Sequence, residues 1–188
     1  MGCVQPHVMR METDDETLAR AANSGDRAAF AALIGRHYDR IHGLAYRLTG
    51  QRAEAQDLTQ DICAALPAKL AAWRGEARFT TWLYRVVVNA AHDRRRRQAV
   101  RSRAALGWGD WELARQDEIA TQAKGLDWLT HAMQRLSPEL RDTVALVLGE
   151  ELTQAQAAEV LGVSEGTIAW RMSEVKKRLR AMAAEDAK

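Results

Sequence analysis

The chain is poor in cysteine, and this shortage excludes one class of protein at once. Two cysteines, Cys3 and Cys63, in 188 residues cannot form a disulfide framework, and they indicate a reducing compartment. Cys63 lies in an apolar helical pattern and is expected to be a small core residue. Cys3 with His7 could bind a metal only weakly.

Net charge and long apolar runs are also lacking. The 27 cations and 25 acids leave a net charge of +2, so the chain is not a uniformly basic coat for nucleic acid, and any DNA contact must come from local clusters. No apolar run approaches the length of a membrane span, and the first residues lack the apolar core of a signal peptide. We therefore expect a cytoplasmic protein.

No segment shows sustained strand alternation, and apolar residues recur at helical spacing along most of the chain. The pattern dissolves only at residues 99–126, where glycines and scattered acids interrupt it. We therefore predict an all-α fold of two small helical domains, 13–98 and 127–184, joined by a flexible linker at 99–126. Residues 1–12 are expected to be a disordered tail.

Helix boundaries in the first domain follow from capping residues and glycines. Four helices are predicted: 14–23, a second from Asp26 to Gly50, a third at about 52–73, and a fourth at about 80–98. In the second domain, Ser137, Pro138 and Glu139 give three agreeing start signals. The buried face of the helix that follows is expected to hold Leu140, Val144, Val147 and Leu148.

The last part of the chain has the pattern of a helix-turn-helix. Thr153 and Gln156 form a capping box, which predicts a helix start at Thr153. Gly162 can adopt the left-handed conformation that ends this helix, and Ser164 is a suitable N-cap for the next. The two starts are close enough to leave only a tight turn, as a DNA-reading motif requires.

The second of these helices has one apolar and one polar side. Ile168, Met172, Val175 and Leu179 follow the helical period and predict a buried stripe. The outward side is polar and rich in cations, as in a helix that enters a major groove, and it holds Thr167, Trp170, Arg171, Ser173, Glu174, Lys177 and Arg178. An ordinary helical hairpin with solvated charges is the alternative.

A second cluster of cations ends the first domain. Between Phe79 and Arg103 seven arginines accompany a single acid, Asp93, and four of them are consecutive at 94–97. Trp82 belongs to the apolar stripe of this helix and is expected to pack rather than to stack on a base. Solvated surface is the common explanation of a charge run, but beside a DNA-reading module a second DNA-binding surface is favoured.

Several of these motifs together resemble the extracytoplasmic-function sigma factors. The segment 57–62, the sequence Trp73-Arg74-Gly75 and the segment 79–89 are similar to region 2 of that family. The segment 136–141 and the helix-turn-helix from Thr153 to Arg180 are similar to region 4. The resemblance covers residues 17–182, with the motifs in the family's order.

The resemblance implies that a polar face of the third helix binds core RNA polymerase. Asp57, Gln60 and Asp61 occupy one face at i, i+3 and i+4, opposite Leu58 and Ile62, and are the residues we expect in that contact. The alternative is a solvated acidic face.

The resemblance also implies promoter contacts in both domains. Asn89 matches a family asparagine near the pocket for a flipped base of the minus-ten element, and an amide can pair with such a base. Arg85, Arg94, Arg95, Arg96 and Arg97 would hold the DNA backbone. Asn89 could instead cap or pair with backbone inside its domain.

The minus-thirty-five element would be read by the last helix, through Thr167, Trp170, Arg171, Ser173, Glu174 and Lys177. Ala169 and Trp170 depart from the family, in which a basic residue followed by serine is common at these positions. The indole of Trp170 could stack on a backbone sugar, contact a thymine methyl or pack against an inhibitor.

No catalytic motif or metal-ligand spacing accompanies these features, so the chain is not expected to be an enzyme, to bind a cofactor or to take a small-molecule substrate. The partners implied are core RNA polymerase, promoter DNA and an anti-sigma factor. Two other classes stay open on the sequence: an autonomous dimeric helix-turn-helix regulator, and a sigma-like protein that only binds an anti-sigma factor.

Overall fold

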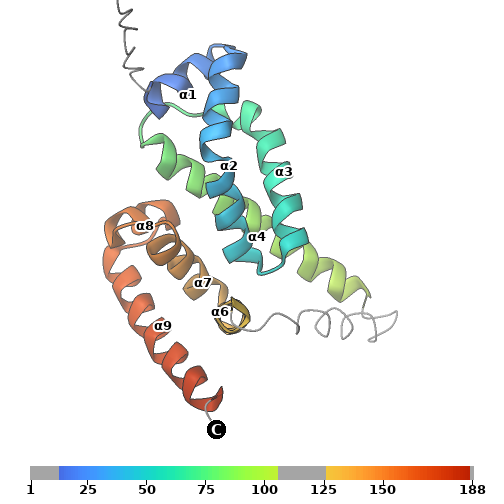
Figure 1. Ribbon diagram of the computed structural model, residues 1–188, viewed down its shortest axis with the longest axis vertical. Coiled ribbons are helices and arrows are strands. Elements are labelled where there is room, and N and C mark those ends of the chain that lie inside the picture. The colour runs from blue at the N-terminus through green and yellow to red at the C-terminus, as the bar shows by residue number, and fades with distance from the viewer. Residues whose placement is uncertain (1–12, 106–125, 187–188) are drawn as a thin grey trace, which may run out of the picture.

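The computed structural model describes residues 13–105 and 126–186, and within these ranges every regular element is helical (Figure 1). The all-α prediction is therefore confirmed. The predicted tail at 1–12, with Cys3 and His7, and most of the predicted linker lie outside the described residues.

The N-terminal half contains four helices, α1 (Asp15–Asn23), α2 (Arg27–Thr49), α3 (Arg52–Leu70) and α4 (Phe79–Ala105). Capping side chains set the first two starts. Asp14 accepts a hydrogen bond from the Thr17 N–H at 2.7 Å, and Asp26 accepts from the first turn of α2. Helix α2 ends before Gly50, as predicted, and Gly50 adopts the left-handed conformation at φ 74°.

The later boundaries differ from the prediction. Helix α3 ends at Leu70 rather than near Trp73, and α4 continues to Ala105 rather than stopping near Gln98. Residues 99–105 are alanine, valine, arginine and serine, with no glycine or proline, so the backbone can stay helical although no apolar stripe continues. The loss of apolar periodicity after Gln98 therefore did not mark the end of α4.

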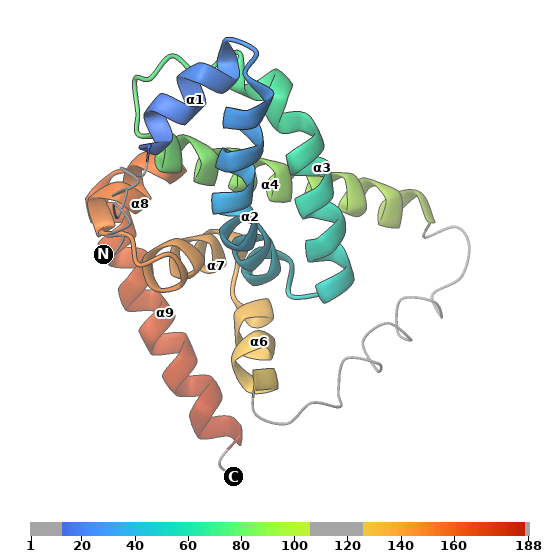
Figure 2. The same cartoon turned by 45° about the horizontal axis from the view of Figure 1, so that its top comes forward.

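Helices α2 and α3 lie side by side, with α4 crossing both (Figures 1 and 2). Their core is formed by fully buried leucines, among them Leu33, Leu44 and Leu83. Trp82 packs against this core, its ring centroid 5.6 Å from that of Phe79, as predicted. Cys63 is half-buried against the same core, and burial raises the pKa of its thiol.

The C-terminal half contains α6 (Leu126–Arg135), α7 (Pro138–Val144), a π-helical turn at Ala145–Gly149, α8 (Gln154–Leu161) and α9 (Glu165–Asp186). Leu140 and Val144 are buried as predicted, but the prediction for Leu148 is wrong, because its side chain is 63% exposed. The wider π turn rotates the residues that follow it away from the α-helical register. Ala145 and Leu146 fill the core in its place.

The two halves share one apolar core. Helix α7 lies against α2, and α8 lies against α4 (Figure 2). Arg141 of α7 is buried where they meet. Its guanidinium donates to the Leu48 carbonyl near the end of α2 at 3.3 Å, and also to the Met133, Gln134 and Leu136 carbonyls near the end of α6. One side chain thus satisfies carbonyls near the C-terminal ends of two helices that belong to different halves.

Ion pairs complete this contact. The carboxylate of Asp142, 3% exposed, is 2.5 Å from His92 Nε2 and 3.3 Å from Arg95 Nη2, and both partners belong to α4. Arg47 of α2 pairs with Glu150, beyond the π turn. Gly149 fits closely beneath Arg47, because a β-carbon there would lie 2.3 Å from the Arg47 Nε atom. The contact is therefore specific in both charge and shape.

Replacing Asp142→Asn should weaken the contact between the halves. The amide keeps the volume but loses the charge that His92 and Arg95 face, a loss of about 2 kcal/mol for charge-assisted hydrogen bonds. We expect the radius of gyration measured by small-angle X-ray scattering to rise while circular dichroism shows unchanged helix content. The matched control is Asp93→Asn, whose carboxylate pairs, among the described residues, only with Arg96 of its own helix. Equal radii for the two variants would contradict this assignment.

Candidate nucleic-acid interface

The helix-turn-helix forms as predicted. The Thr153 N–H donates to Gln156 Oε1 at 2.9 Å, and the Gln156 N–H donates to Thr153 Oγ1 at 3.2 Å, which completes the capping box at the start of α8. Gly162 ends α8 at φ 66°. Ser164 then accepts from the Thr167 N–H at 3.1 Å and begins α9.

Buried apolar residues fix the rotation of α9. Ile168, Met172 and Val175 are buried against the other helices, and Leu179 is half-buried in line with them. The predicted stripe is therefore confirmed. On the opposite side, Trp170, Ser173 and Lys177 are exposed, whereas Thr167, Arg171 and Glu174 are half-buried.

Two of the predicted minus-thirty-five residues already have intramolecular partners. Glu174 Oε1 lies 2.8 Å from Arg178 Nε, and this hydrogen bond lowers the pKa of the Glu174 carboxyl. The Thr167 hydroxyl is 2.8 Å from that of Ser164. In the described part of the chain, no hydrogen bond or ion pair holds Trp170, Ser173 or Lys177, and these side chains are available to a partner.

The predicted polymerase-binding residues form an acidic surface on α3. Asp57, Gln60 and Asp61 are all exposed, while Leu58 and Ile62 on the other side of the helix are buried. The side chains of Asp57 and Asp61 are 65% and 73% exposed. We call Asp57, Gln60 and Asp61 the acidic face.

Arg94 reaches this acidic face from α4. Its guanidinium lies 2.5 Å from Glu54, 3.3 Å from Asp57 and 3.4 Å from Asp61. The hydrogen bond to Glu54 raises the pKa of Arg94 further. Arg94 was expected to hold the DNA backbone, but here it binds three carboxylates of α3.

The other predicted minus-ten residues are divided between free and occupied side chains. Asn89 and Arg97 are exposed, and no hydrogen bond joins either side chain to another described residue. Arg96 is exposed and pairs with Asp93, at 2.9 Å. Arg85 and Arg95, in contrast, contact the C-terminal half.

Arg85 donates to the Glu159 carbonyl of α8 at 2.7 Å. This carbonyl lies near the C-terminal end of α8, where the helix dipole favours a cation. Asn89 follows Arg85 by four residues and precedes His92 by three, so all three share one face of α4. Of the predicted minus-ten residues, Arg85 and Arg95 are therefore turned toward the C-terminal half, although Asn89 itself stays exposed.

No local sequence pattern indicates the partners of these cations. Asp142, Glu150 and the Glu159 carbonyl lie between 47 and 103 residues from the groups that they bind. Tyr84 is a related case, because burial, together with Glu150, raises its pKa to about 12. In the sequence, nothing distinguishes Tyr84, Asp142 and Glu150 from ordinary residues of a helical protein.

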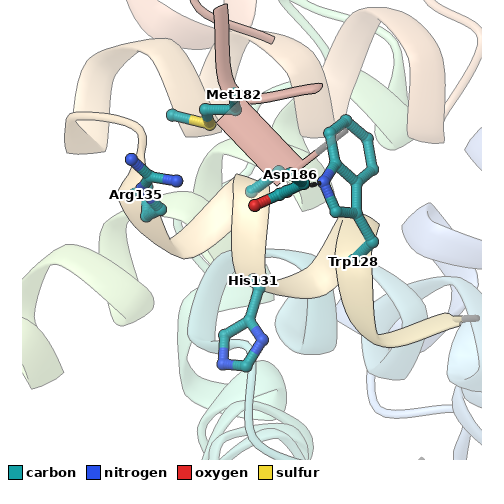
Figure 3. Close-up of a pocket in the computed structure, with 6 residues that line it drawn as sticks. Trp128, His131, Arg135, Met182 and Asp186 are labelled. Carbon is teal, nitrogen blue, oxygen red and sulfur yellow. Dashed lines mark hydrogen bonds between the residues drawn. The ribbon is translucent and has the colours of Figure 1, made fainter. Parts of the chain in front are cut away.

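A separate hollow lies between α6 and α9. It is lined by Trp128, His131, Ala132, Arg135, Met182 and Asp186. Figure 3 shows the Trp128 indole beside the Asp186 carboxylate, and the indole Nε1 donates a hydrogen bond of 2.5 Å to this carboxylate.

No group of three metal-ligating side chains occurs among the described residues. No helix in the same part of the chain has the length and apolar character of a membrane span.

Comparisons with known proteins agree with this geometry. Residues 33–101 match sigma-70 region 2, and residues 126–179 match sigma-70 region 4. The ECF RNA polymerase sigma factor SigM of Mycobacterium tuberculosis is 34% identical over 171 residues, which cover 90% of this chain and 85% of SigM. The RNA polymerase sigma-H factor of Pseudomonas aeruginosa is 28% identical over 182 residues, covering 91% and 94% of the two chains.

A solved structure has the same arrangement of helices. It is that of CnrH in complex with the cytosolic domain of CnrY, with a TM-score of 0.68 at 26% identity, covering 92% of this chain and 98% of CnrH. An autonomous dimeric regulator would account for the helix-turn-helix but not for the match to region 2. The chain belongs to the extracytoplasmic-function group of the sigma-70 family, non-catalytic initiation factors that direct RNA polymerase to particular promoters.

Proposed function

We propose that this sigma factor binds core RNA polymerase through the acidic face, reads the minus-ten element through Asn89 and reads the minus-thirty-five element through the exposed side of α9. The main support for the proposal is that the acidic face, Asn89 and the polar side of α9 are exposed, while the opposite sides of the same helices are buried in the core. Polymerase and promoter DNA are both cytoplasmic in bacteria, and we place the protein there. The phosphodiester chemistry belongs to the polymerase.

Promoter binding requires the halves to separate. Arg85 and Arg95 can contact phosphates only after they leave the Glu159 carbonyl and the Asp142 carboxylate. We infer that an anti-sigma factor controls this sigma factor by covering its polymerase-binding surface. In support, the similar protein CnrH is held by the cytosolic domain of CnrY.

The acidic face can be tested by changing Asp57, Gln60 and Asp61 together to alanine. If they form the centre of the polymerase contact, affinity for purified core polymerase should fall by about thirtyfold, the loss of about 2 kcal/mol that defines a binding hot spot. Fluorescence anisotropy of the labelled full chain measures this affinity. Asp39→Ala removes an exposed acid from α2 and should bind normally. Unchanged affinity in the triple variant would exclude this surface.

Substitutions of Arg94 and Arg97 should have different effects, although the sequence analysis assigned both residues to one DNA-binding cluster. Because Arg94 holds the carboxylates of α3, Arg94→Ala should weaken polymerase binding and leave the salt dependence of promoter binding unchanged. Arg97→Ala should instead reduce the slope of log affinity against log salt by about one, as expected for one lost phosphate contact. Both are measured by filter binding of the holoenzyme to promoter DNA. Equal slopes in the two variants would return Arg94 to the DNA-binding set.

Asn89 is tested by transcription with purified core polymerase. Asn89→Ala should still bind polymerase, but promoter opening should lose its preference at one minus-ten position by about tenfold, within the range of one bidentate base contact. Permanganate footprinting of opened promoters carrying each base at each position gives the readout. Gln98→Ala, an exposed amide later in α4, is the matched control. An unchanged preference in Asn89→Ala would remove the flipped-base assignment.

A further inference from the structure

Trp170 stands out on the exposed side of α9. Its residue surface is 64% exposed, whereas Trp73 is buried and Trp82 packs against the core. The N-terminal side of Trp170 is open, because Gly166 lies one turn earlier and an added β-carbon there would meet only Ser164 Oγ, at 3.9 Å. Ser173 and Glu174 lie one turn later on the same side of α9.

The direction of Trp170 is fixed by the residues on either side. Ile168 and Met172, two positions before and after it, are 0% and 8% exposed, so both face the core. Residues two apart on a helix point in nearly opposite directions. The capped start of α9 at Ser164 also places Trp170 within the first two turns, the part of a recognition helix that contacts base edges.

An indole can recognise few groups in a major groove. It has one N–H donor, no acceptor and a large apolar surface. Thymine alone presents an acceptor, O4, beside an apolar group, the 5-methyl, whereas cytosine presents an amino donor that an indole cannot accept. Ser173 and Lys177 lie along the same side of α9, so a hydroxyl and a cation extend this surface toward the backbone.

We propose that Trp170 is a specificity-determining residue that reads a thymine of the minus-thirty-five element through its methyl group and O4. The proposal rests on the proposed function of α9. It commits the indole to a base edge rather than to a backbone sugar or to an inhibitor.

The test uses the full chain assembled with core RNA polymerase. Promoters with a randomised minus-thirty-five element are selected by wild-type and Trp170→Ala holoenzymes, and the selected bases are compared by sequencing. We expect the wild type to prefer thymine at one position by about tenfold, and the variant to lose this preference there alone. Lys177→Ala, the matched control, should weaken binding to all sequences similarly and keep the thymine.

Replacing that thymine by deoxyuridine removes only the methyl group. The wild-type holoenzyme should lose about fourfold in affinity, the value of one buried methyl-sized group, and Trp170→Ala should lose nothing. Trp170 is exposed, so the variant should fold, which circular dichroism verifies.

Two results would overturn the proposal: an unchanged base preference in Trp170→Ala, or equal losses on deoxyuridine in both proteins. Affinity lowered equally for every sequence would indicate contact with a sugar and would also reject it. The proposed function fails separately, if the wild-type holoenzyme shows no preference anywhere in the randomised element.

Discussion

The carboxylate of Asp142 is almost completely buried, and a buried charge is tolerated only beside opposite charges. Its partners, His92 and Arg95, belong to α4 in the other half of the molecule. The position of α7 against α4 therefore follows from this one requirement, reinforced by Arg141 at the end of α2. Because α8 and α9 continue from α7, the orientation of the helix-turn-helix relative to α4 depends on the same contact.

Charge in this protein is divided between internal and external use. Arg85, Arg94 and Arg95 each bind oxygen atoms of the protein itself, although all three lie in a cluster that resembles a DNA-binding surface. Arg97 is free of such partners among the described residues. A count of arginines therefore overstates the number of cations that are available to DNA in this arrangement. The small net charge of +2 is consistent with this, because acids nearly equal cations in number.

The candidate site was predictable to different degrees for physical reasons. The acidic face and the exposed side of α9 depend on helical periodicity within one element, which the sequence contains in full. The partners of Arg94 and Arg85 depend on which helices become neighbours, and no local pattern records that. Leu148 shows the same limit within a single segment, because a π turn changed the register on which its predicted burial relied.

Local sequence by itself determined the helices, their caps and the two sides of α9, since a capping box, a left-handed glycine and a periodic apolar stripe act within a few residues. Together with the order of the motifs, it also determined the family. Tertiary structure alone decided that the two halves pack closely and that Arg85, His92 and Arg95 of α4 face α7 and α8. The reason is that hydrogen bonds such as that between Asp142 and His92 join residues fifty positions apart, and such contacts exist only once the chain has folded.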